Sequence, residues 1–157
     1  MVGSEAERGG IIRNGAKLVN AVSNSKVPHL NLNVGSSYGA GNYGMGGLPY
    51  DPRFIFTWPN HRIAVMGPSV LAGVMEIVAR NSAAGRGIEV DEEALAAQTQ
   101  GLEAQIEAES TALYSTGRVW DDGIIHPNDS RTVLGLALSA IHSNVVDGTD
   151  SYGVWRH

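Results

Sequence analysis

Cysteine is absent from these 157 residues, which excludes disulfide bonds, a thiol nucleophile and any metal site with cysteine ligands. Basic residues are few, 11 against 16 acidic ones, and a chain of net charge −5 without a basic patch is a poor nucleic-acid binder. No apolar run reaches the roughly 18 residues that a membrane span needs, and the N-terminus lacks the layout of a signal peptide. We therefore expect a cytoplasmic or mitochondrial-matrix protein that binds neither nucleic acid nor membrane.

Glycine, by contrast, is abundant, with 20 residues gathered mainly in the segments 39–47 and 67–87. Hydrophobic residues make up 43% of the chain, which is close to the average of globular proteins. The glycines therefore indicate tight turns and close backbone packing in one folded domain, not disorder.

The hydrophobic pattern predicts an α/β domain, because strands alternate with helices. The expected strands are 27–34, 53–58 and 62–66, and the expected helices are 9–25, 40–48, 67–81, 91–109 and 130–143. Residues 82–87 are expected to form a break after the helix 67–81. Residues 114–119 are expected to be irregular or strand-like, and residues 145–157 to form a loose tail. The sequence opens with a helix before the first strand, and few strands are visible. Both features suggest that the chain starts inside a domain.

The segment 35–45, GSSYGAGNYGM, carries the strongest functional signal. It follows an apolar run that is typical of a buried strand, and it leads through glycines into a predicted helix. Backbone N–H groups at such a junction have no intrahelical acceptor, and small residues let a ligand approach them closely. We expect this turn to hold an oxyanion with main-chain donors.

Other interpretations of the polar motifs are weaker. Residues 39–44 match G-x-G-x-x-G, but no acidic residue occurs between Asp51 and Glu76 to bind a ribose, and no lysine completes a phosphate-binding loop. A glycine-rich helix–sheet contact without function stays open. Asp121 and Asp122 could supply paired carboxylates, although Asp-Gly is primarily a turn signal. Neither a metal-ligand cluster nor a histidine partner for Ser36 or Ser37 can be identified.

Residues 35–45 resemble the signature of the carboxyltransferase (β) subunit of biotin-dependent acyl-CoA carboxylases, most closely the methylcrotonoyl-CoA and geranyl-CoA branch. Three further segments agree in order and spacing: residues 1–7, residues 52–67 with PRF and WPN, and residues 118–131 with RVWDDGII. Propionyl-type members usually carry Asp where Tyr43 stands, which favours the first branch. The methylcrotonoyl branch usually has Cys at the position of Gly46, so the acyl substrate is left open.

The resemblance implies a crotonase-like (ClpP/crotonase) α/β fold. The chain would form a partial C-terminal carboxyltransferase domain, residues 1–144, that lacks its first core strand and is followed by the tail 145–157. In the family, the preceding N-terminal domain binds acyl-CoA and the C-terminal domain takes carboxybiotin. The carboxybiotin is presented by a carrier protein, and a biotin carboxylase subunit is a further expected partner. Active sites form between subunits, so a homo-oligomer is expected.

The resemblance also implies the roles of individual residues. The amides of Ala40 and Gly41 would stabilise the oxyanion of biotin, and the family scheme requires neither a side-chain acid or base nor a metal in this chain. Tyr38, Gly39, Asn42 and Tyr43 would shape the biotin or acyl pocket, and Gly3 would lie near the opposite wall.

Two rival functions stay open at this point. One is a stand-alone crotonase-type acyl-CoA hydratase or isomerase, and the other is a non-catalytic partner that completes another subunit's interface. A hydratase needs a carboxylate pair beside the oxyanion donors, so the position of Asp121 and Asp122 relative to Ala40 separates these alternatives.

Overall fold

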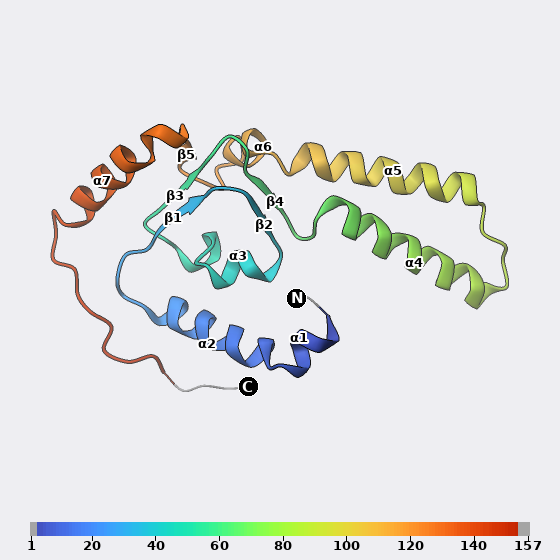
Figure 1. Cartoon of the computed structure of the whole chain (residues 1–157), viewed down its shortest axis with the longest axis horizontal. Helices are drawn as coiled ribbons and strands as arrows, with labels where there is room; N and C mark the ends of the chain where they lie inside the picture. The colour runs from blue at the N-terminus through green and yellow to red at the C-terminus, as the bar shows by residue number, and fades with distance from the viewer. Residues whose placement is uncertain (1–2, 154–157) are drawn as a thin grey trace.

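Two small parallel sheets form the centre of the computed structural model, which describes residues 3–153 (Figure 1). The first sheet has the order β1-β3-β5 and the second pairs β2 with β4. The strands are β1 (Leu30–Asn33), β2 (Ser36–Tyr38), β3 (Phe54–Thr57), β4 (Arg62–Ala64) and β5 (Gly123–Ile124).

Two stretches of the chain each contribute a strand to both sheets. β1 continues into β2 through residues 34 and 35, and β3 continues into β4 through residues 58–61. The register is parallel in both sheets, with Leu30 opposite Phe54 and Ser36 opposite Arg62. The second sheet therefore ends at the glycine-rich turn, where Tyr38 lies opposite Ala64.

Helices surround these sheets on several sides (Figure 1). α1 and α2 precede the first strand, α4 and α5 form a hairpin that extends away from the sheets, and α7 lies on the opposite side. The helices are α1 (Ser4–Arg8), α2 (Ile11–Asn24), α3 (Ala40–Gly44), α4 (Pro68–Arg86), α5 (Glu92–Glu109), α6 (Ala112–Thr116) and α7 (Ser130–Ile141), with 3-10 turns at Leu48–Tyr50 and Pro127–Asp129.

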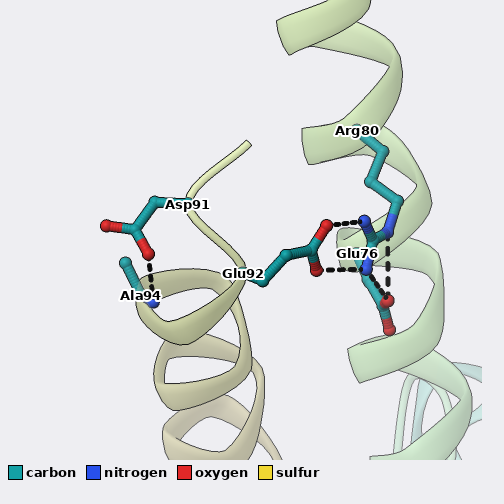
Figure 2. A network of polar contacts seen from close by, with 5 residues as sticks. All are labelled: Glu76, Arg80, Asp91, Glu92 and Ala94. Carbon is teal, nitrogen blue, oxygen red and sulfur yellow. Dashed lines mark hydrogen bonds and ion pairs between the residues drawn. The ribbon is translucent and has the colours of Figure 1, made fainter. Parts of the chain in front are cut away.

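The α4–α5 hairpin is stabilised by local polar contacts (Figure 2). The side chain of Asp91 accepts a hydrogen bond from the N–H of Ala94 at 3.0 Å and so caps α5, which lies within the helix that the sequence predicts over 91–109. Arg80 of α4 binds Glu92 at the start of α5 through two hydrogen bonds of 2.5 and 2.8 Å, and it also contacts Glu76 one turn earlier. The hydrogen bonds to Glu92 and Glu76 raise the pKa of Arg80, and the bond from Arg80 lowers the pKa of Glu92.

Most predicted elements are present, and the exceptions have physical reasons. The expected break at 82–87 is wrong, because α4 continues to Arg86 and ends where Gly87 adopts a left-handed conformation with φ 66°. The segment 114–119 is irregular only over 117–119, because residues 114–116 belong to a short helix that Thr111 caps by accepting from the N–H of Tyr114. The strand β2 was not expected, since three residues become a strand here only by pairing with β4.

Little apolar surface is fully buried in the described part of the chain. The buried hydrophobic residues are Ile55, Ala72, Leu95, Ala112 and Ala137, whereas α4 exposes a stripe of four large ones at helical spacing: Val70, Val74, Ile77 and Val78.

The tail after α7 runs back towards α2 (Figure 1). There, Lys26 pairs with Asp150, and the side chain of Asn20 donates to the carbonyl of Tyr152. The predicted ranges 1–144 and 145–157 stay predictions, and their ends at 1–2 and 154–157 lie outside the described residues.

Candidate functional site

The glycine-rich turn joins β2 to α3 in a conformation that requires glycine. Gly39 has φ 64° and ψ −144°, and its N–H donates to the carbonyl of Ala64 at 3.1 Å. A Cβ atom built on Gly39 would lie 3.1 Å from the carbonyl oxygen of Val65, closer than most real contacts. The turn is thereby held tightly against the end of β4, and α3 starts at the next residue.

The amides of Ala40 and Gly41 follow this turn and have no internal acceptor. Among residues 3–153, neither N–H donates a hydrogen bond to another turn, loop or side chain, whereas the next amide, of Asn42, donates to the carbonyl of Gly39 at 3.2 Å. Ala40 and Gly41 are both exposed. Two neighbouring donors are therefore available to an external anionic atom.

A cavity of about 840 Å³ opens beside these amides. Its walls are mostly apolar, and they come from β1, from both strands of the second sheet, from α3 and from the end of α5. The polar and aromatic residues in its lining are Asn31, Asn33, Ser37, Asn42, Tyr43, Glu109, Ser110, Tyr114 and Trp120, together with Ala40 at the turn. A cavity of this size can hold a small organic group.

The structure brings together only some of the residues named from the sequence. Gly39, Ala40, Asn42 and Tyr43 line the cavity, and the side-chain amide of Asn42 donates to the hydroxyl of Ser37 at 2.8 Å. Gly41 is adjacent but does not belong to the lining.

Tyr38 and Gly3 lie elsewhere. The ring of Tyr38 packs beside Gly67, 3.5 Å from the position that a Cβ would take there, and Tyr38 is outside the cavity lining. Gly3 is exposed at the start of α1, where its carbonyl accepts a hydrogen bond from Glu7, and it does not line the cavity either.

The two aspartates that a hydratase would need are engaged in structural contacts. Asp122 accepts a hydrogen bond from the N–H of Ile55 at 2.7 Å and donates its own N–H to the Ile55 carbonyl at 2.8 Å. Asp121 accepts from the hydroxyls of Ser115 and Thr116 at 3.2 and 2.7 Å. Neither aspartate lines the cavity, so the described chain offers no carboxylate pair beside the amide donors.

Several cavity walls were missed at the sequence level. Glu109 ends α5, and Tyr114 and Trp120 form an edge-to-face pair with ring centroids 6.0 Å apart. Arg118 stacks over the ring of Tyr114 with its guanidinium carbon 3.3 Å from the centroid. These residues are far from the turn in sequence, and only the RVWDDG motif gave a signal near them.

Comparison with known proteins decides the family. The carboxyl transferase domain family matches residues 1–150. This chain belongs to that family.

Across the part of the carboxyl transferase domain that is described, no helix is long and apolar enough to cross a membrane, and no cluster of three or more potential ligands could hold a metal ion.

Relatives of this domain are β subunits of carboxylases. The chain is 54% identical over 156 residues to a protein of Mycobacterium tuberculosis described as a probable biotin-dependent acyl-coenzyme A carboxylase beta2 subunit, covering 99% of the chain and 30% of that protein. It is 47% identical to a probable mitochondrial methylcrotonoyl-CoA carboxylase beta chain of Drosophila melanogaster, with coverage of 99% and 27%. The chain thus spans less than a third of these relatives.

Solved structures agree with this membership. The β subunit of geranyl-CoA carboxylase from Pseudomonas aeruginosa superposes with a TM-score of 0.82 at 43% identity, covering all of this chain and 30% of that one. The hexameric transcarboxylase 12S subunit gives a TM-score of 0.71 at 27% identity, covering all of this chain and 28% of that one. The expectation of a crotonase-like α/β carboxyltransferase fold is confirmed.

Proposed function

We propose that this domain performs carboxyl transfer from carboxybiotin to an acyl-CoA, and that the amides of Ala40 and Gly41 stabilise the oxyanion of that step. The proposal depends on one observation: two consecutive N–H groups lack an acceptor at the edge of a largely apolar cavity. The fit to biotin is chemical, because a neutral ring system with one polar ureido group suits an apolar pocket with a few fixed donors.

When bound, carboxybiotin supplies CO2 and leaves negative charge on its ureido oxygen. In this proposal Ala40 and Gly41 donate two hydrogen bonds to that oxygen, and the bond from the N–H of Gly39 to Ala64 supports it by holding the turn that precedes them. Donors that are fixed before the reaction stabilise developing charge without reorganisation, and removing one typically costs about 3–4 kcal/mol. Tyr43 and Asn42 would form the adjoining walls.

The relatives support a proposal for the substrate and the partners. We assign an acyl-CoA of the methylcrotonoyl or geranyl type, a biotin carrier with its biotin carboxylase subunit, and self-association into an oligomer. The exposed apolar stripe of α4 supports association, because such surface is normally covered. Bacterial and mitochondrial relatives support a bacterial cytoplasm or a mitochondrial matrix as the location.

The test removes one amide while the helix remains. In Ala40→Pro the donor is lost at the first position of α3, where proline is well tolerated. We expect kcat for carboxyl transfer to fall roughly 100- to 1000-fold in the assembled carboxylase. Ala40→Ser keeps the N–H at the same exposed position and serves as the matched control.

A second variant guards against a local distortion by proline. Gly41→Val adds a branched side chain beside the other donor, where no atom lies within 4 Å of the new Cβ, so the fold should persist. We expect it to abolish transfer while circular dichroism stays unchanged. Normal turnover in both variants would exclude the proposed role of these amides.

A further inference from the structure

We infer that His61 is a positioning residue for the oxyanion donors, because its imidazole N–H holds the carbonyl of Gly35 at the start of the strand that leads to Ala40. The inference rests on the proposed function of Ala40 and Gly41. It assigns a role to a buried histidine that, within the described part of the chain, forms no hydrogen bond with either of these residues.

The side chain of His61 is almost completely buried, with 1% of its surface exposed, and its Nδ1 lies 2.7 Å from the Gly35 carbonyl oxygen. A carbonyl oxygen can only accept, so Nδ1 must carry the proton. Burial lowers the pKa of His61, which keeps the ring neutral, while the bond to Gly35 and the charge of Asp121 act in the opposite direction. A neutral ring with a fixed tautomer is a permanent donor to this one carbonyl.

The strand between this bond and the donors is short and fixed at both ends. At its start, the Gly35 carbonyl accepts from His61 and, at 3.3 Å, from the N–H of Arg62. At its end, the N–H of Gly39 donates to the carbonyl of Ala64. Only β2 (Ser36–Tyr38) lies between, and Ala40 follows at once. His61 therefore holds one of the two ends of the extended segment that leads to the amides.

His61 is itself held rigidly, which a positioning role requires. The backbone N–H of His61 donates to the carbonyl of Trp58 at 3.0 Å, which closes the turn that joins β3 to β4. The neighbouring Arg62 is directed to Glu107 of α5, 3.3 Å away. His61 therefore links the turn between β3 and β4 to the bend between β1 and β2.

Oxyanion donors act through accurate placement, and a misplacement of about 1 Å can cost as much as 100-fold in rate. Losing the imidazole donor should therefore lower kcat much more than it raises KM for acyl-CoA. A merely structural histidine would affect the midpoint of thermal unfolding without this split.

The experiment compares two substitutions in the assembled carboxylase that contains this chain. His61→Leu fills the space but removes the donor, whereas His61→Asn places a side-chain N–H close to where Nδ1 was. Thr57→Val is the matched control, because Thr57 is completely buried in β3, lies outside the cavity lining, and its hydroxyl has no partner among the described residues.

We expect His61→Leu to lower kcat roughly tenfold or more with little change in KM for acyl-CoA. His61→Asn should return kcat to within about twofold of the unmodified protein, since its amide donates as the imidazole does. Thr57→Val should leave both constants unchanged. Hydrogen–deuterium exchange of the peptide containing Gly39 should be faster in His61→Leu alone, because its bond to Ala64 reports on the pairing of β2 with β4.

Three results would overturn the inference: an unchanged kcat in His61→Leu, an equal loss in His61→Asn, or unchanged exchange at Gly39. A failure of the proposed function looks different, because the unmodified protein would then show no carboxyl transfer or the Ala40→Pro variant would be fully active. The exchange measurement is independent of activity, so it tests the structural link in either case.

Discussion

At the residue scale, Val119 shows where this chain accepts backbone strain. It has φ 60°, a left-handed conformation that β-branched residues rarely adopt. The N–H of Val119 bonds to the carbonyl of Thr116 and that of Trp120 to the carbonyl of Ser115, the pattern that ends many helices at a glycine. The strained turn delivers Trp120 to the cavity wall.

We expect Val119→Gly to raise the free energy of unfolding by about 0.5–1 kcal/mol, because relief of the left-handed strain exceeds the added flexibility of glycine. Little packing is lost, since 80% of the Val119 side chain is exposed. Urea titration of the variant measures the change. Val145→Gly is the control, because Val145 is equally exposed and has no positive φ. A gain of the same size in both variants would contradict this explanation.

His61 makes the stability of the fold depend on pH. Burial lowers its pKa below the ordinary value of 6.5, so below pH 6.5 the unfolded chain gains a proton before the folded protein does. Stability attributable to His61 is complete above pH 6.5 and is lost as the pH falls towards the lowered value. The contribution to the slope is at most about 1.4 kcal/mol per pH unit.

Urea titrations between pH 5 and 8 measure this dependence, and His61→Asn provides the reference, because it keeps a donor to Gly35 and cannot titrate. We expect the free energy of unfolding of the unmodified protein to fall more steeply below pH 6.5 than that of the variant. Parallel curves would show that the histidine titrates alike in both states.

At the element scale, residues that act locally were the predictable ones. The sequence predicted a helix over 91–109, where α5 lies, and short strands over 53–58 and 62–66, where β3 and β4 lie. The turn at Gly39 was predictable because its glycines precede a helix. The cavity walls were not, since Glu109 and Trp120 approach the turn only through the packing of α5, α6 and the second sheet.

The bonds between α4 and α5 give a prediction at this scale (Figure 2). Arg80→Gln removes the ion pairs with Glu76 and Glu92, so we expect a slightly lower midpoint of thermal unfolding at low ionic strength. These side chains are exposed, and salt screens such pairs, so the difference should shrink in concentrated sodium chloride. Arg86→Gln on the same helix controls for lost charge, because Arg86 forms no ion pair with any residue that the structure describes. A difference that persists at high salt would indicate lost packing.

At the scale of the whole molecule, the chain covers less than a third of its relatives and leaves many large apolar side chains exposed. The resemblance to carboxyltransferase subunits implies an active site shared between domains or subunits, and such a site cannot work in one of them alone. We therefore expect this chain by itself to carboxylate no acyl-CoA when supplied with free biotin. Mass spectrometry of the acyl-CoA products measures this, with the assembled carboxylase and its carrier as the positive control. Turnover by the isolated chain would contradict the proposal of a partial domain.

The strand register has a consequence for the order in which the protein folds. Residues 30 and 54, or 36 and 62, are joined by a much shorter stretch of chain than residues 56 and 123, which meet only after the α4–α5 hairpin has been bridged. Closing a longer loop costs more chain entropy before any contact repays it. We expect the pairs β1–β3 and β2–β4 to nucleate first, so that the oxyanion turn is assembled early and β5 closes the first sheet as a late kinetic event.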